Sequence, residues 1–173
     1  MNVRKGNIPQ NSLVNKDLAV DYSDVYFCTV LGGLNITPDD IQVAFWTDSP
    51  KWVDNLFKLR NWIVKPFGLQ QGEGKNAQKF EECIRTGGKL SFVSVPDKSP
   101  NETILCLTDK HLTAYLSVYI EDMEDDKRTI YLATLVNFHN MLGYIYFYTI
   151  YPFHHIVVKK ILERTIKKLL KSN

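Results

Sequence analysis

The chain has 173 residues and a mass of 20.0 kDa, and 45% of its residues are hydrophobic, which suits one well-buried core better than two domains. Its formal net charge of +2 is too balanced to predict nucleic-acid binding, which needs clustered lysines and arginines. The three cysteines, Cys28, Cys83 and Cys106, are far apart and fit neither a zinc site nor a disulfide framework. The glycines form no nucleotide-binding motif, so we expect no cofactor and no metal.

The first 20 residues are polar and irregular, and they predict a flexible arm, residues 1–20, ahead of a single domain, residues 21–173. The arm has no apolar segment typical of a secretory signal, and no run in the chain approaches the ~18 apolar residues of a membrane span. These features favour a cytoplasmic protein.

In chain order, the predicted elements begin with a strand over 25–31, which is rich in β-branched and aromatic residues and ends at two glycines. Thr37 then predicts a helix start, because its hydroxyl can cap the first turn and the proline and aspartates behind it suit that position. The helix is expected over 38–46, a second helix over 52–64, and a short turn of helix over 80–86.

The middle of the chain predicts a run of strands. We expect them over 89–95, 103–108, 111–121 and 128–138. In 111–121 apolar residues alternate strictly with polar or aromatic ones, which is typical of a strand with one buried face. The connections are short, so an antiparallel meander is the simplest topology.

A change of period is expected at Pro152. The stretch 143–151 is aromatic and β-branched, with a tyrosine at every second position, and predicts a last strand. Pro152 fits the first turn of a helix, and apolar residues recur at three-to-four spacing over 152–171. We therefore expect a long amphipathic helix that covers one face of the sheet.

This order of elements resembles the helix-grip fold of the START-like (SRPBCC) superfamily. Three strings also resemble the domain of unknown function 2867 family: DYSDVYFCTV from Asp21, WVDNLFKLRNWIVKPFGLQ from Trp52, and YPFHHIVVKKIL from Tyr151. The resemblance implies an α+β fold in which a curved antiparallel sheet of about six strands wraps on the long C-terminal helix, with a helix pair after the first strand. It implies no activity, since the family has none established.

We expect a cavity between sheet and helix, because a single helix cannot fill a strongly curved sheet. The leading hypothesis is a protein that binds a small apolar or amphipathic ligand in that cavity. The residues predicted to bind this ligand are Trp62, Leu116, Val118, Leu132, Thr134, Tyr146, Phe147, His154 and Ile161. The pattern does not decide the orientation of Tyr144, Tyr146 and Tyr148. Their side chains either point toward the ligand or lie on the other, exposed or half-exposed face of the sheet.

Two alternatives stay open. An enzyme acting on a small apolar substrate would use His154 or a tyrosine as acid or base, but no carboxylate near His154 and His155 in sequence orients either ring, which favours a binding protein. The basic face of the last helix suits an acidic partner or a membrane surface, although most such faces are the solvated side of a packed helix, and we expect no membrane binding. Arg60 is expected to pair with Asp21 or Asp24, and the loop over 70–78 to form a lid. The sequence favours no particular oligomeric state.

Overall fold

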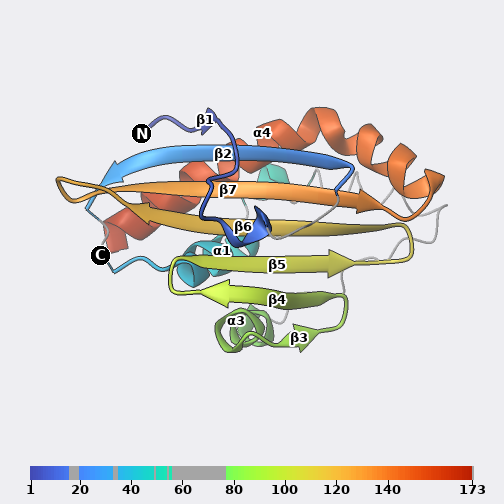
Figure 1. Cartoon of the computed structure of the whole chain (residues 1–173), viewed down its shortest axis with the longest axis horizontal. Coiled ribbons are helices and arrows are strands. Elements are labelled where there is room, and N and C mark those ends of the chain that lie inside the picture. Colours follow the sequence, from blue (N-terminus) through green and yellow to red (C-terminus); the bar gives the residue numbers. More distant parts are fainter. Residues whose placement is uncertain (16–19, 33–34, 49, 54, 56–76, 173) are drawn as a thin grey trace.

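A curved antiparallel sheet of seven strands forms the centre of the fold, in the order β1-β2-β7-β6-β5-β4-β3 (Figure 1). The structure is a computed structural model, and it describes residues 1–15, 20–32, 35–48, 50–53, 55 and 77–172. The strands are β1 (Arg4–Lys5), β2 (Tyr22–Leu31), β3 (Lys89–Leu90), β4 (Val93–Ser99), β5 (Glu102–Thr108), β6 (Leu112–Asp122) and β7 (Lys127–Phe138).

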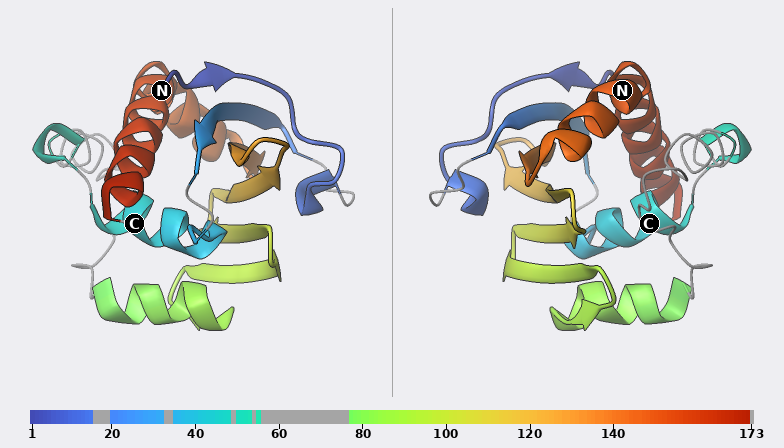
Figure 2. Two further views of the ribbon diagram at one scale, coloured as in Figure 1. Left: turned by 90° about the vertical axis from the view of Figure 1, so that its left-hand side faces the viewer. Right: turned by 90° about the vertical axis from the view of Figure 1, so that its right-hand side faces the viewer.

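The helices α1 (Pro38–Thr47) and α4 (Met141–Ser172) lie on one face of this sheet, and the N-terminal arm lies on the other (Figure 2). A third helix, α3 (Ala77–Thr86), packs beside α1 and the β3–β4 edge. Side chains of β7 alternate between the two faces of the sheet. Ile130 and Leu132 pack toward the helices, while Ala133 and Leu135 pack toward the arm. The larger core cluster is the one between the sheet and the two helices.

The predicted class is confirmed: the protein is α+β, with a curved antiparallel sheet and a long C-terminal helix, consistent with a helix grip. The predicted helix start is also confirmed. Thr37 caps α1 in a capping box, in which its hydroxyl accepts from the Asp40 amide at 3.2 Å and the Asp40 carboxylate accepts from the Thr37 amide at 3.0 Å. The sheet has seven strands rather than about six. The arm contributes β1 and the stretch predicted over 89–95 divides into β3 and β4, whereas the strand predicted over 143–151 is absent because this stretch is helical.

The prediction of a last strand over 143–151 is wrong, because α4 already begins at Met141 and contains Pro152 in its interior. Asn140 starts the helix: its side-chain oxygen accepts from the Gly143 amide at 3.1 Å, as a helix cap does. Proline lacks the amide that would continue the hydrogen-bond ladder, and α4 changes direction between its orange and red parts (Figure 2).

The predicted strand end at Val95 is also wrong, since β4 continues through Pro96 to Ser99. The pairing of β4 with β5 shifts register between Ser94 and Asp97, so Pro96 sits in an irregularity of the ladder. A bulge is one of the few places where a strand tolerates a residue without an amide hydrogen.

The N-terminal arm packs on the sheet. Arg4 and Lys5 pair with β2, and Val3 and Val14 are buried. A short 3-10 turn, η1 (Leu13–Asn15), follows the point where the arm meets the Glu102 carboxylate. The flexibility expected of residues 1–20 stays a prediction.

Several predictions fall mainly outside the described residues: the helix over 52–64, the ion pair of Arg60 and the lid over 70–78. Within the described part of the chain, no helix is long and apolar enough to cross a membrane. Within the same ranges, no group of three or more His, Cys, Asp or Glu residues is placed to hold a metal ion.

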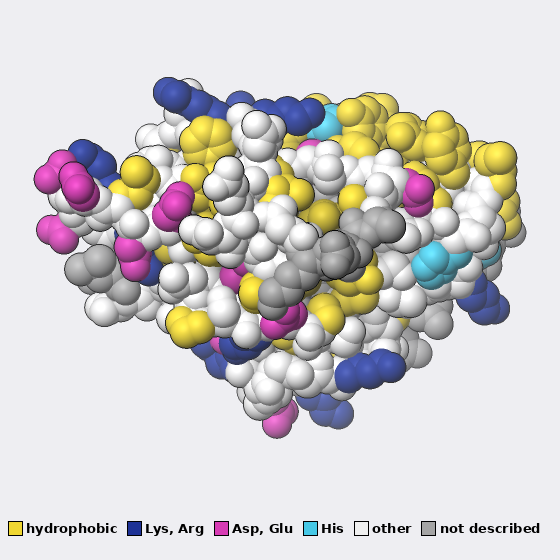
Figure 3. Space-filling model, in the orientation of Figure 1, with side chains coloured by type: hydrophobic (Ala, Val, Ile, Leu, Met, Phe, Trp, Pro, Cys, Tyr) yellow, Lys and Arg dark blue, Asp and Glu magenta, His cyan; other side chains and the backbone are white. Residues whose placement is uncertain are grey.

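The first half of α4 exposes an unusual amount of apolar surface. The side chains concerned, which we call the apolar ridge of α4, are Met141, Leu142, Tyr144, Ile145, Tyr148, Phe153 and Ile156. They contribute to the yellow surface at the upper right of Figure 3. The segment 141–158 contains no Asp, Glu, Lys or Arg, so no charged side chain belonging to it interrupts the ridge.

Candidate ligand-binding cavity

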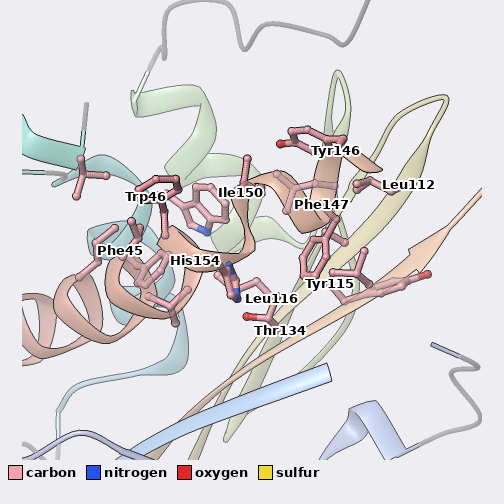
Figure 4. Close-up of a pocket in the computed structure, with 18 of the residues that line it drawn as sticks. Phe45, Trp46, Leu112, Tyr115, Leu116, Thr134, Tyr146, Phe147, Ile150 and His154 are labelled. Atoms are coloured by element: carbon pink, nitrogen blue, oxygen red, sulfur yellow. The ribbon is translucent and has the colours of Figure 1, made fainter. Parts of the chain in front are cut away.

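A cavity of about 260 Å³ lies between the sheet, α1 and α4 (Figure 4). Its walls are mostly apolar. They consist of Phe45, Trp46, Val53, Leu107, Leu112, Ala114, Tyr115, Leu116, Thr134, Val136, Tyr146, Phe147, Thr149, Ile150, Phe153, His154, Val157, Val158 and Ile161. Mostly apolar walls with a few polar side chains are the usual composition of a small-molecule site.

The sheet side of the cavity follows from strand register. Leu116 on β6 lies directly opposite Thr134 on β7, and two residues along, Ala114 lies opposite Val136, so all four share one face. On the helix side, Phe147 anchors α4 on the sheet by packing against Tyr22 and Phe138, with ring centroids 4.6 and 5.4 Å apart.

The wall formed by α1 is fixed through a buried amide. Gln42 is fully buried, and its Nε2 donates to the backbone carbonyl oxygens of Thr103 at 3.1 Å and Leu116 at 2.8 Å. Its Oε1 in turn accepts from the Trp46 indole at 3.2 Å. These bonds hold Trp46 over the strands at one end of the cavity.

Six of the nine residues predicted to bind the ligand line this cavity. They are Leu116, Thr134, Tyr146, Phe147, His154 and Ile161. Val118 and Leu132 are instead completely buried in the neighbouring core, and Trp62 lies outside the described residues. That any of these residues contacts a ligand stays a prediction.

The helical path of 141–151 separates the tyrosines that a strand would have put on one face. Tyr146 is half-buried and lines the cavity, whereas Tyr144 and Tyr148 are exposed with ring centroids 4.5 Å apart. Sequence reasoning missed Ile150, Phe153 and several other wall residues of α4 for the same reason. A strand period groups residues at every second position, and the helix groups them at every third or fourth.

Asp24 is the main finding at this site that the sequence did not predict. It lies on β2 with a fully buried side chain, and its Oδ2 is 3.3 Å from Nε2 of His154 and 3.5 Å from Nδ1 of His155. The Tyr22 hydroxyl donates to the same oxygen at 2.8 Å. A carboxylate therefore does lie beside both histidine rings, contrary to the expectation that no carboxylate orients them.

Opposing effects act on the charge of Asp24. Burial alone would raise the pKa of this carboxyl, but the contact with His154 and the hydrogen bond from Tyr22 outweigh it and hold the pKa below its usual value. The residue therefore stays a carboxylate at neutral pH. Its negative charge acts on the cavity from behind His154.

Tyr26 also contacts these side chains: its hydroxyl lies 2.7 Å from Nδ1 of His155. Burial, with the Asp24 charge, raises the pKa of Tyr26 to about 12. Burial also lowers the pKa of His155, although Asp24 opposes this effect. The neutral imidazole accepts at Nδ1 while the phenol donates.

The lowered pKa of His155 makes stability depend on pH. The unfolded state takes up this proton more readily, so the contribution of His155 is complete above its usual pKa of 6.5 and is lost as the pH falls through the lower folded value. Urea unfolding at pH 7.5, 6 and 5 should therefore show a falling free energy. His155→Gln, which keeps an acceptor for Tyr26 but does not titrate, should show a flatter decline; the same decline in both proteins would contradict this assignment.

A signal for Asp24 was present in the sequence. Tyr22, Asp24, Tyr26 and Cys28 alternate on one face of a strand, and Asp24 is the charged residue among positions that are otherwise aromatic or apolar. A charge at such a position is costly unless it is paired, and it therefore points to a partner on another element.

Fold and cavity together define the protein as an α+β protein whose curved antiparallel sheet and long C-terminal helix enclose an apolar cavity. The chain belongs to the family described as Protein of unknown function (DUF2867), whose model matches residues 18–161. No curated protein and no solved structure matches the chain. The wider relationship to the START-like superfamily stays a prediction.

Proposed function

We propose that this protein binds a small apolar or amphipathic molecule in the cavity between the sheet and α4. The observation that supports the proposal is the cavity itself, about 260 Å³ between the sheet and the helices, with mostly apolar walls. This volume equals that of roughly nine water molecules in the liquid. A ligand with about eight carbon atoms is of the corresponding size.

The expected affinity is modest. Burial contributes about 0.8 kcal/mol per methylene, so an eight-carbon chain contributes roughly 6 kcal/mol before any costs. Lost translational and rotational freedom offsets much of this, which leaves dissociation constants in the micromolar to millimolar range. Octan-1-ol is therefore a suitable first probe.

Filling the cavity should abolish this binding. Ile150 lines the cavity, and Ile150→Trp would place an indole in the space that the probe needs. We expect octan-1-ol to raise the Tm of the wild-type protein and to leave the Tm of Ile150→Trp unchanged, as measured by differential scanning fluorimetry.

The matched control is Ile156→Trp, an exposed position on the same helix that does not line the cavity. It should keep the wild-type response. If Ile150→Trp responds like the wild-type protein, the probe does not occupy this cavity. Native mass spectrometry of freshly purified protein would show directly whether a small molecule co-purifies.

An enzyme is a second candidate, because Asp24 lies behind a histidine that lines the cavity. A buried carboxylate of this kind orients an imidazole and stabilises its protonated form, as in acid–base catalysis. Loss of a measured turnover in His154→Ala, with retained binding of octan-1-ol, would favour this alternative over binding alone.

The third candidate function is that of an interaction module. The apolar ridge of α4 supports it more directly than the basic second half of the helix does. Exposed apolar surface rimmed by polar residues is typical of contact sites. Lys160, Arg164, Lys167 and Lys168 belong to the basic half, but Arg164 and Lys168 already pair with Asp48. Salt-sensitive co-sedimentation with liposomes would favour a membrane surface; no co-sedimentation would remove it.

A further inference from the structure

One wall of the cavity holds three buried polar atoms that form no well-aligned hydrogen bond within the described part of the chain, although His154 and Thr134 both interact with the Asp24 carboxylate and lower its pKa. They are Oδ1 of Asp24, Oγ1 of Thr134 and Nε2 of His154. Buried polar atoms are well paired in the great majority of cases, so three neighbouring atoms without a well-aligned bond call for an explanation. Asp24 and Thr134 are only 3% and 6% exposed, so both are shielded from bulk solvent.

The three atoms come from three elements that meet at one place. Asp24 on β2 is the register partner of Thr134 on β7, and His154 reaches them from α4, 3.3 Å from the Asp24 carboxylate. Figure 4 shows the His154 ring and the Thr134 side chain beside one another in the wall of the cavity. Both side chains line the cavity, so a ligand there contacts both while Asp24 lies behind them.

The hydrogen-bonding character of this cluster is that of an acceptor. Asp24 is a carboxylate, and neither of its oxygens can donate. The Tyr22 hydroxyl is already committed to Asp24, and the Tyr26 hydroxyl to His155. The Thr134 hydroxyl and Nε2 of His154 both interact with the Asp24 carboxylate, so the lone pairs of the Thr134 oxygen remain for a donor that a ligand supplies.

We propose that Thr134, His154 and Asp24 form a head-group site that binds a hydrogen-bond-donating group, a hydroxyl or a protonated amine, at the end of an apolar ligand and disfavours a carboxylate. This inference rests on the proposed binding function and adds the chemical class of the ligand. A donor can bind the lone pairs of the Thr134 oxygen beside Asp24, whereas a carboxylate would meet the Asp24 charge at short range in surroundings of low dielectric constant.

Three probes with the same eight-carbon tail test the proposal: octan-1-ol, octylammonium and octanoate. The two charged probes carry opposite charges on the same tail, so their relative affinity reports the sign of the field at the head-group site. At pH 7.5 we expect isothermal titration calorimetry to give at least tenfold tighter binding of octylammonium than of octanoate. Asp24→Asn should reduce this ratio to within about threefold of unity, because it removes the charge and keeps the shape.

Thr134→Val provides a second variant with smaller risk to folding, since it removes only the hydroxyl that faces the probe. It should weaken octan-1-ol about five- to tenfold, the loss of one hydrogen bond. Thr129→Val is the matched control, because Thr129 is also buried on β7 but bonds to Thr29 and does not line the cavity. It should leave all three affinities unchanged.

The outcomes separate the two proposals. Equal affinities for octylammonium and octanoate in the wild-type protein, or tighter binding of octanoate, overturn the head-group assignment and leave an apolar binding cavity. A preference for octylammonium that survives both Asp24→Asn and Thr134→Val also overturns it. If none of the three probes binds, the binding function itself fails.

Discussion

Gly143→Ala is expected to lower the free energy of unfolding by about 3 kcal/mol, although alanine is the better helix former by about 1 kcal/mol. The substitution is destabilising because a Cβ atom has no room there, and this outweighs the higher helix propensity of alanine. A Cβ atom at Gly143 would lie 2.1 Å from the backbone oxygen of His111 and 2.8 Å from its carbonyl carbon. Backbone cannot rotate away as a side chain does, so the first turn of α4 must shift as a whole.

That shift would also affect the cavity, since Tyr146 and Phe147 lie on the next turn of the same helix and line it. The His111 carbonyl oxygen is held in place because it accepts from the His139 amide at 2.8 Å. We therefore expect Gly143→Ala to weaken octan-1-ol as well as to destabilise the fold. Urea unfolding and the probe titration measure the two effects separately.

The control is Gly87→Ala. Gly87 has a φ of +73°, and a Cβ there would meet nothing within 4 Å, so only the cost of a left-handed backbone applies, about 1 kcal/mol. A Gly143→Ala protein as stable as the wild type, or more stable, would show that α4 does not approach His111 this closely.

The parts of the fold that the sequence predicted are those decided by neighbouring residues. The cap of α1 needs only Thr37 and the residues directly behind it, and these form the expected capping box. The strand predicted over 111–121 is β6, one residue later at each end, because strict alternation has little other interpretation.

The first half of α4 was predicted wrongly because its residues suit both structures. Tyrosines at every second position fit a strand, but Tyr144, Phe147, Tyr148 and Tyr151 also follow the three-to-four spacing of a helix. Packing between distant segments decides between these two: Asn140 caps the helix, and the absence of a side chain at Gly143 lets it rest on His111. The preference for strands is weaker than such contacts.

The cavity walls were predicted in part for a related reason. The sheet side, with Leu116 and Thr134, follows from alternation that the sequence displays. The pair of Asp24 and His154 joins the first long strand to the last helix, and no spacing in the chain brings these two residues together. A charged residue at an inward strand position was the available sign; it points to Asp24 but does not give His154 as its partner.

Glu102→Ala should also lower the free energy of unfolding by about 3 kcal/mol. Glu102 is 1% exposed on the arm-facing side of the sheet, where its Oε1 accepts from the hydroxyls of Ser12 at 2.7 Å and Ser117 at 2.5 Å. Its Oε2 accepts from the Leu13 amide at 2.6 Å. Hydrogen bonds to a charged acceptor are stronger than neutral ones, and the substitution removes the acceptor of three donors, two of which belong to the buried residues Ser12 and Ser117.

The loss should be concentrated in the N-terminal arm, because two of the three donors belong to it. We expect amide hydrogen exchange over residues 4–15 to accelerate by tenfold or more in Glu102→Ala, while β6 and β7 change only with global stability. Ser117→Ala removes one donor together with its hydrogen bond. It should lower the free energy of unfolding by about 1 kcal/mol and leave the arm protected from exchange. Glu82→Ala, at an exposed glutamate of α3, should stay within about 0.5 kcal/mol of the wild type. Unchanged protection of the arm in Glu102→Ala would mean that β1 and the buried Val3 and Val14 hold it without this carboxylate.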